Sequence, residues 1–451
     1  MNLYSAEHLW TPEGFVADAR FRVRAGLGLD LAQAAAGTPA SIGRFVLPGL
    51  VNAHSHAFQR AMAGLAERRG HEEDSFWTWR DVMYRFAALI GPDELYAIAA
   101  QLYVEMLEAG YTTVCEFHYL HHQPDGRPYD DPAELSLALL AAARDTGIAM
   151  TLLPVLYMRG GFDGRPLQAR QLRFAHDVDA YLGLLQSLRS REDAGLRVGM
   201  ALHSLRAVPV DAMASVLAAE QGHRRPIHVH IAEQVPEVEE CLALRGQRPV
   251  DWLHRHAEVD ARWTLVHATH IDAEETGRTA ASGATVAICP STEANLGDGL
   301  FPLKAFLDAG GSMSIGSDSH VSISPVEELR WLEYGQRLRA QRRNIAVAPA
   351  QPSVGVHLFE RAWRGGLRSA FGSAAPEVPR GDLIVLDDAH PLLAGRDASQ
   401  VIDTWIFSGN RPLVRDVMVD GRWVVRDGRH PHREQIAAAF GRVMARLAAS
   451  M

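Results

Sequence analysis

Residues 45–56 read Phe-Val-Leu-Pro-Gly-Leu-Val-Asn-Ala-His-Ser-His, an apolar and β-branched run that ends in two histidines. Such a run predicts a buried strand over Phe45–Ser55. His54 and His56 are two positions apart, so their side chains should project from the same face of that strand. The stretch therefore points to a buried sheet with ionisable side chains at the end of one strand.

The same pattern recurs along the chain, and longer helical patterns separate the runs. Alternation of this kind is typical of a parallel sheet with crossover helices. Eight such units predict an α/β fold, a (β/α)8 TIM-like barrel, in which catalytic groups lie at the carboxyl ends of the strands. The further strands are expected at Thr112–Tyr119, Ala149–Tyr157, Arg197–Ser204, Pro226–Ala232, Trp263–Thr269, Thr285–Pro290 and Ser312–Asp318. Helices are expected at Pro92–Ala109, Asp131–Thr146, Val208–Glu220 and Asp272–Ala281.

Polar residues gather at six of the eight expected strand ends. Besides His54-Ser55-His56, the clusters are Glu116-Phe117-His118, His203-Ser204-Leu205-Arg206, His230-Ile231-Ala232-Glu233, His267-Ala268-Thr269-His270 and Ser317-Asp318-Ser319-His320. A single polar strand end would be incidental. Six of them, placed at the edge where barrel enzymes do their chemistry, indicate a site.

The two ends of the chain show short strands joined by turns. Residues 1–47 and roughly 375–430 have this character, and Asp420-Gly421 is a hairpin signal. We expect both ends to build one small β-sandwich domain without chemistry of its own. The expected division is residues 1–47 and 373–451, including a terminal helix, for the small domain, and residues 48–372 for the barrel.

Composition limits the class of protein. The 451 residues suffice for a barrel with an accessory domain, and the net charge of −9, from 45 basic and 54 acidic residues, argues against a nucleic-acid partner. It does not exclude an anionic substrate. The first residues lack a signal-peptide pattern, and no apolar run approaches the ~18 residues of a membrane span. Cys115, Cys241 and Cys289 form no C-x-x-C pair, which fits a reducing cytoplasm.

His54 and His56 could bind one metal ion if further ligands converge on them. An isolated H-x-H pair is more often two ordinary histidines, because zinc sites need three or four ligands. Here His230 at strand five and Asp318 at strand eight supply the other donors. Nitrogen and carboxylate donors suit zinc or a similar divalent ion. Three histidines and one aspartate also leave room for a water molecule, as in catalytic sites, while the native metal stays open among zinc, iron, nickel and manganese.

These residues resemble the amidohydrolase superfamily, over about residues 46–320 and the flanking β domain. The matching positions are His54, His56, His230, His267 and Asp318. Binuclear members bridge two metals with a carboxylated lysine. The only lysine here, Lys304, follows strand seven and is wrongly placed for that role. The resemblance therefore implies a mononuclear deaminase with one divalent metal per chain, taken to be zinc.

The same branch shows H-x-x-E at strand five, which stands here as His230-Ile231-Ala232-Glu233. The resemblance implies that Glu233 shuttles protons and that His267 holds or polarises the attacking water, with Asp318 both a ligand and a proton acceptor. Read alone, Glu233 could instead be a carboxylate that stabilises a helix N-terminus. The remaining nearby histidines are expected behind the ligands or at the surface; they are His118, His121, His122, His270 and His320.

Within the superfamily, several stretches resemble the formimidoylglutamate deiminases. They are Asn52–Leu65, Asp74–Arg80, Glu116–His122, His203–Val208, Leu265–His270, Ser291–Gly299 and Ser317–Gln336. The resemblance covers nearly the whole chain and implies hydrolysis of N-formimino-L-glutamate to N-formyl-L-glutamate and ammonia, in histidine degradation. Many related purine, pyrimidine and triazine deaminases carry P-S-N-x-x-L-G after strand seven. The segment Pro290–Gly297 is one residue longer and departs from that group.

N-formiminoglutamate has two carboxylates and a cationic amidine-like head, so its pocket needs arginines and neutral donors. Five residues near the strand ends or in the first loop could provide them, and the resemblance assigns substrate contacts to the same positions: Gln59, Arg80, Tyr119, His203 and Arg206. Each also has an ordinary structural role open to it. For Arg80, stacking with Trp77 and Trp79 in the core carries equal weight.

Two other functions stay open. The first is a metal-dependent deaminase of a nucleobase-like or aminated heterocycle, whose pocket should offer aromatic stacking and amide edges in place of arginines. The second is a catalytically inactive barrel that serves as an assembly module, although such a protein should have lost its ligands. The expected partner is a small-molecule dicarboxylate substrate, with neither nucleic acid nor membrane, and a homodimer is one open alternative for the oligomeric state.

Overall fold

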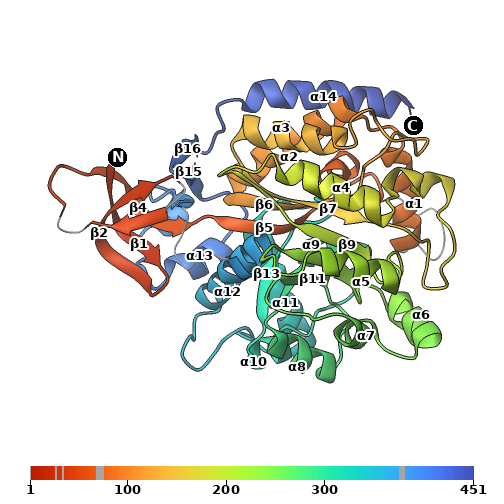
Figure 1. The fold of residues 1–451 in the computed structure, drawn as a ribbon. Coiled ribbons are helices and arrows are strands. Elements are labelled where there is room, and N and C mark those ends of the chain that lie inside the picture. The colour runs from red at the N-terminus through yellow and green to blue at the C-terminus, as the bar shows by residue number, and fades with distance from the viewer. Residues whose placement is uncertain (1, 26–27, 33–34, 68–75, 375–380, 451) are drawn as a thin grey trace.

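The computed structural model describes residues 2–25, 28–32, 35–67, 76–374 and 381–450. A barrel of parallel strands surrounded by helices forms the larger part, and a mixed sheet built from both ends of the chain lies beside it (Figure 1). The barrel strands are β5 (Leu50–Ser55), β6 (Tyr111–His118), β7 (Ala149–Leu156), β8 (Leu196–Val198), β9 (Met200–Ser204), β10 (Ile227–Ile231), β11 (Trp263–His267), β12 (Thr285–Ile288) and β13 (Ser312–Ile315). Since β8 and β9 both pair with β7, they share the fourth position, and the predicted eight-position barrel is confirmed.

The barrel closes at the site itself. Strands run in the order β5-β6-β7-β9-β10-β11-β12-β13, and the seam between the last and the first is made by a parallel bridge between Ser55 and Asp318. The Asp318 amide donates to the His54 carbonyl (3.0 Å), and the His56 amide donates to the Asp318 carbonyl (3.3 Å). Closure of the barrel therefore brings Asp318 next to the H-x-H pair.

Helices cover the outside of the barrel. They are α1 (Phe76–Ala87), α2 (Pro92–Ala109), α3 (Glu134–Thr146), α4 (Val178–Arg189), α5 (Val210–Ala219), α6 (Val235–Arg245), α7 (Pro249–His256), α8 (Ala273–Ser282), α9 (Pro290–Leu296), α10 (Leu303–Asp308), α11 (Pro325–Ala340), α12 (Val354–Phe371) and α14 (Arg433–Ser450). Their ends follow local chemistry: Asp272 caps α8 through the Glu274 and Glu275 amides, and Gly110 ends α2 with φ 105°. The terminal helix α14 packs on α2, where Arg446 bonds Glu94 (2.7 Å).

The small domain contains one seven-stranded sheet, in the order β16-β15-β14-β4-β1-β2-β3. Its strands are β1 (Leu3–Thr11), β2 (Gly14–Arg24), β3 (Gly28–Leu31), β4 (Ala40–Pro48), β14 (Leu383–Leu386), β15 (Val414–Val419) and β16 (Arg422–Val425). Asp420 and Gly421 both have positive φ (46° and 78°) and join β15 to β16, so the hairpin prediction is confirmed. The expectation of strands throughout 375–430 was wrong, because Val401–Phe407 forms the helix α13.

Two predicted strands are interrupted by glycine. The run Phe45–Ser55 is two strands, since β4 ends at Pro48 in the small sheet and β5 begins at Leu50 in the barrel. At Gly49 a Cβ atom would lie 2.2 Å from Thr112 Cγ2, so only glycine lets the chain cross there. Gly199 divides the fourth strand in the same way, with Leu153 and Pro226 within 2.8 Å of a Cβ atom.

Among the described residues, no helix combines the length and the apolar character needed to cross a membrane. All three cysteines, Cys115, Cys241 and Cys289, are buried and free.

Candidate active site

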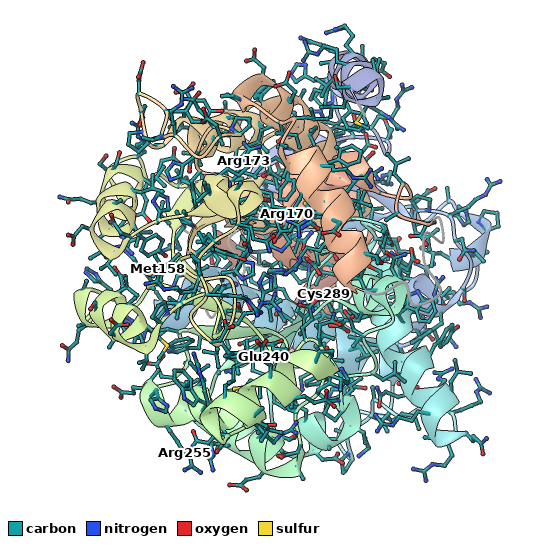
Figure 2. The ribbon with its side chains drawn as sticks, turned by 90° about the vertical axis from the view of Figure 1, so that its right-hand side faces the viewer. Met158, Arg170, Arg173, Glu240, Arg255 and Cys289 are labelled. Carbon is teal, nitrogen blue, oxygen red and sulfur yellow. The ribbon has the colours of Figure 1, made fainter. Side chains whose placement is uncertain are left out.

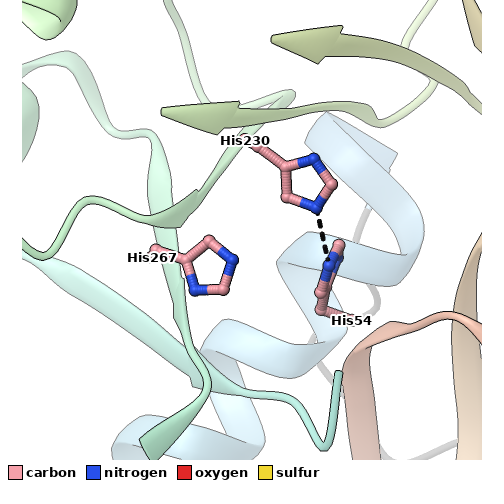
Figure 3. Close-up of side chains that lie close together, drawn as sticks. All are labelled: His54, His230 and His267. Carbon is pink, nitrogen blue, oxygen red and sulfur yellow. Dashed lines mark hydrogen bonds between the residues drawn. The ribbon is translucent and has the colours of Figure 1, made fainter. Parts of the chain in front are cut away.

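Four side chains converge at the carboxyl end of the barrel. The Nε2 atom of His54 lies 3.0 Å from His230 Nε2, the contact that the dashed line in Figure 3 marks. It also lies 3.1 Å from His56 Nε2. Asp318 Oδ1 lies 3.4 Å from His54 Nε2 and 3.3 Å from His56 Nε2. All four side chains are buried. The residues predicted as a ligand set thus come from three strand ends to one point.

The hydrogen bonds of this cluster leave a place for a cation. His56 Nδ1 donates to the Phe117 carbonyl (2.9 Å), and His230 Nδ1 donates to the His203 carbonyl (3.0 Å). Their Nε2 atoms therefore carry lone pairs, and both face His54 Nε2, which can donate one proton at most. With the Asp318 carboxylate added, acceptors outnumber protons, so a divalent metal ion fits this donor set.

Burial also keeps these imidazoles neutral. Desolvation is the main reason that the pKa values of His54, His56 and His230 lie below their usual range, and the neighbouring histidines add to the effect for His54 and His230. Neutral imidazole is the form that binds a metal.

Glu233 and His267 stand beside the cluster. His267 Nε2 lies 3.8 Å from Glu233 Oε1 and 3.8 Å from Asp318 Oδ2. No side-chain hydrogen bond caps the N-terminus of the following helix α6, whose N-cap residue is Gln234. The Glu233 side chain instead lines the cavity and accepts a hydrogen bond from Gln234 Nε2 (3.4 Å).

Glu293 also belongs to this group, although it was not predicted from the sequence. His267 Nδ1 donates to Glu293 Oε1 (3.3 Å), and the Cys289 amide donates to the same oxygen (3.0 Å). Burial alone would lower the pKa of His267, but Glu233, Glu293 and Asp318 together raise it to about 10. The signal was present, since Glu293 lies in the lengthened segment after strand seven.

The backbone is strained at these strand ends. His267 has φ 68° and Asp318 has φ 44°, and Ala232, between His230 and Glu233, has φ 50°. Left-handed φ values outside glycine are costly and tend to occur at functional sites. The strained positions are thus two predicted site residues, His267 and Asp318, and one residue that lies between two others.

One cavity opens over the cluster and includes every predicted site residue except His54. Its lining combines His56, His230, Glu233, His267 and Asp318 with Gln59, Arg80, Tyr119, His203 and Arg206, and it encloses about 590 Å³ of empty space with its open mouth. Aromatic side chains also line the cavity at Trp79, Tyr84, Tyr157 and Phe174, together with the apolar side chains of Met83 and Leu296.

The predicted substrate residues come from different elements. Gln59 lies in the 3-10 helix η1 (Ala57–Met62) and donates to the Tyr119 hydroxyl (2.8 Å). His203 still belongs to β9, and Arg206 follows in the next turn. Arg80 lies on α1, over the ring of Tyr84 (5.6 Å). Of the two tryptophans expected to stack on Arg80, Trp79 lines the same cavity, whereas the Trp77 side chain lies outside the described residues. Residues 74–75 of the matching stretch Asp74–Arg80 also lie outside them.

The other histidines lie outside the cavity lining. His118, His121, His122 and His176 form a separate cluster, with the rings of His121 and His176 4.4 Å apart. His320 is buried, and its Nε2 atom accepts a hydrogen bond from the His56 amide (3.2 Å). His270 Nε2 donates to the Asp298 carbonyl (2.8 Å). Lys304 lies on α10 and pairs with Asp308 (2.5 Å).

Comparison with known proteins agrees with this geometry. The model of the amidohydrolase family matches residues 45–351. The chain is 52% identical to a formimidoylglutamate deiminase of Pseudomonas aeruginosa, over 99% of this chain and 100% of that protein. It is 28% identical to an 8-oxoguanine deaminase of the same species, over 94% of this chain and 92% of that protein.

Solved structures show the same fold. An amidohydrolase from Brucella melitensis superposes with a TM-score of 0.92 at 42% identity, covering 99% of this chain and all of that one. An adenosine deaminase from Xanthomonas campestris, solved with bound zinc, superposes with a TM-score of 0.80 at 21% identity, covering 99% and 98%.

Proposed function

The chain belongs to the amidohydrolase family, and from this premise we propose that it hydrolyses N-formimino-L-glutamate to N-formyl-L-glutamate and ammonia. One observation carries the proposal: a single cavity joins the donor cluster, through His56, His230 and Asp318, to two arginines, Arg80 and Arg206. The donor cluster suits hydrolysis of a polarised carbon–nitrogen bond, and the two arginines suit the binding of a carboxylate. The relative with 52% identity carries the name of this activity.

The two guanidinium groups act on each other. Burial lowers the pKa of Arg80, and the charge of Arg206 lowers it further, although the Tyr84 and Tyr157 hydroxyls oppose the shift. An anion between the arginines would relieve this repulsion, and charge-assisted bonds to a carboxylate are among the stronger interactions a pocket can offer. We assign substrate binding to Gln59, Arg80, Tyr119, His203 and Arg206.

Zinc, or a similar divalent ion at His54, His56, His230 and Asp318, would acidify a water molecule and so supply the nucleophile. Glu233 would deliver a proton to the imino nitrogen as ammonia leaves. His267, oriented by its bond to Glu293, would donate a hydrogen bond to the oxygen that adds to the formimino carbon. Asp318 would accept the proton that the water gives up. The atoms balance, because one water enters and one ammonia leaves.

A deaminase of an aminated heterocycle is the second candidate, since the aromatic lining could stack a ring. We favour the formimino acid because two arginines line the same cavity. Ammonia release from N-formimino-L-glutamate, guanine and cytosine separates the two. The proposal expects release from the first substrate alone, and faster release from guanine would overturn it.

The remaining expectations are part of the proposal. We propose a small dicarboxylate as the partner of the site and a cytoplasmic location, which the three buried free thiols support.

A further inference from the structure

Gln171 holds two tyrosine hydroxyls at the edge of the cavity. Its Nε2 atom donates to Tyr157 Oη (2.9 Å) and to Tyr84 Oη (3.2 Å), and all three side chains are buried. Gln171 lies in the 3-10 helix η2 (Ala169–Phe174), whereas Tyr84 is on α1 and Tyr157 follows β7. In Figure 2, Arg170, next to Gln171 in the chain, lies beside α1, and its guanidinium pairs with Asp81 of that helix (2.6 Å).

The orientation of the Gln171 amide is fixed. Its Oε1 atom accepts the Gln168 amide (2.9 Å), and a flipped side chain would turn a donor toward that N–H group. The two hydrogens on Nε2 are therefore both used on the tyrosine oxygens. Since Nε2 cannot accept, neither tyrosine can donate its own hydrogen to Gln171.

Both tyrosine hydrogens are thus left for another acceptor. Within the described residues, neither hydroxyl donates to a protein acceptor, and both tyrosines line the cavity. Burial, with a smaller contribution from Tyr84, raises the pKa of Tyr157 to about 12, so this hydroxyl stays a donor at neutral pH. The Arg80 guanidinium lies over the Tyr84 ring (5.6 Å), and Arg80 and Arg206 line the same cavity as the two phenols.

Ring contacts join Tyr157 to the metal-binding cluster through His203. The ring of His203 lies 5.2 Å from that of His230, and the ring of Tyr157 lies 4.4 Å from that of His203, so Tyr157 stands one ring contact farther from the cluster. In N-formimino-L-glutamate the side-chain carboxylate is separated from the formimino carbon by more bonds than the α-carboxylate. The tyrosine pair therefore lies where the more distant carboxylate would be expected.

We propose that Tyr84 and Tyr157 donate hydrogen bonds to the side-chain carboxylate of the substrate, between Arg80 and Arg206, and that Gln171 is the positioning residue that turns both hydroxyls toward it. The inference rests on the proposed function and adds specificity-determining residues to it. Two phenol hydroxyls and two guanidinium groups would all donate to this carboxylate, whose two oxygens can together accept about four hydrogen bonds.

The test uses the metal-loaded enzyme and four variants. Tyr157→Phe and Tyr84→Phe should each raise KM for N-formimino-L-glutamate about ten-fold while kcat and metal content change little. Gln171→Glu should raise KM further, because a carboxylate would accept both phenol hydrogens and compete for the arginines. Gln171→Met should have a smaller effect than Gln171→Glu, since it leaves both hydroxyls free to donate. If Gln171→Met raised KM as much as Gln171→Glu, Gln171 would be structural and the positioning role would be wrong.

A matched control and a second measurement keep the result decisive. Tyr181→Phe removes an equally buried hydroxyl, which donates to the Pro154 carbonyl (2.9 Å) outside the cavity lining, and should lower Tm without changing KM. The Kd of glutarate, measured by calorimetry, should rise about ten-fold in Tyr157→Phe and stay unchanged in Tyr181→Phe. An unchanged glutarate Kd in Tyr157→Phe and Tyr84→Phe would overturn the tyrosine pair. Absence of turnover in the parent enzyme would overturn the proposed function alone.

Discussion

At the scale of single residues, Glu233 is the clearest test of the chemistry. Replacing it with glutamine keeps the size of the side chain but removes its ability to carry a proton. Glu233→Gln should lower kcat by about 10²–10⁴, because general acid catalysis contributes on that order. Metal content and KM should be retained, since Glu233 lies outside the donor cluster. Activity within a few-fold of the parent in a steady-state assay would assign the proton to another group.

Arg206 tests recognition of the acidic side chain. Arg206→Met should lower kcat/KM for N-formimino-L-glutamate by about one to two orders of magnitude, given roughly 1.5–3 kcal/mol for a hydrogen bond to a charged group. N-formiminoglycine, which lacks the side-chain carboxylate, should be a poor substrate from the start and lose little more. Equal losses on both compounds would show that Arg206 has a structural role.

From the sequence one could predict the residues at strand ends and, through the family resemblance, Gln59 and Arg80 on helices; the residues that the fold brings in without a motif were missed. His54, His56, His230 and Asp318 lie at strand ends, so their meeting follows from barrel geometry. Tyr84, Tyr157 and Gln171 come from an α-helix, a strand end and a 3-10 helix, and no spacing in the chain relates them. Glu293 acts through His267, so no ligand pattern includes it.

At the scale of elements, the main errors came from local patterns that tertiary structure overrides. The apolar run Phe45–Ser55 reads as one strand, although Pro48-Gly49 marks the crossing from one sheet to another. The segment Val401–Phe407 is rich in residues that favour strands, yet it forms a helix packed on α12 and α11. Hydrophobic periodicity identifies long elements such as α2, but it does not show whether a short apolar run forms a strand or a helix.

Close packing of α12 on the barrel gives a test at this scale. A Cβ atom on Gly365 would lie 1.8 Å from the Met313 carbonyl oxygen of β13, a backbone atom that cannot turn away. Gly365→Ala should therefore destabilise the fold by about 3 kcal/mol or more, beyond ordinary overpacking. Urea unfolding followed by circular dichroism measures the change.

Gly183 supplies the matched control. It lies exposed inside α4, with open space around a Cβ atom. Gly183→Ala should stabilise the protein by roughly 0.5–1 kcal/mol, because alanine favours a helix over glycine. If both variants behaved alike, α12 would not be held as closely to β13 as the structure shows.

At the scale of the whole molecule, buried histidines make stability depend on pH. Desolvation is the main cause that lowers the pKa of His118 to about 3 and that of His176 to about 4, whereas unfolded histidine titrates near 6.5. Between these values the unfolded chain binds more protons than the folded one. The free energy of unfolding should therefore fall as pH is lowered from about 6.5 toward 4.

Urea midpoints at several pH values check this expectation. His176→Gln removes one such group, so its midpoint should decline less steeply between pH 6.5 and 4 than that of the parent. Parallel curves for the two proteins would exclude His176 as a source of the acid sensitivity.

One divalent metal ion, held beside a carboxylate-binding cavity, should make this chain a deiminase. The most direct measurement titrates metal-free protein with Zn²⁺ and follows ammonia release from N-formimino-L-glutamate. The rate should rise linearly and level off near one equivalent per chain, since four donors converge on one point and Lys304, the only lysine, lies on α10. A rate that requires two equivalents, or no ammonia at any metal concentration, would contradict this expectation.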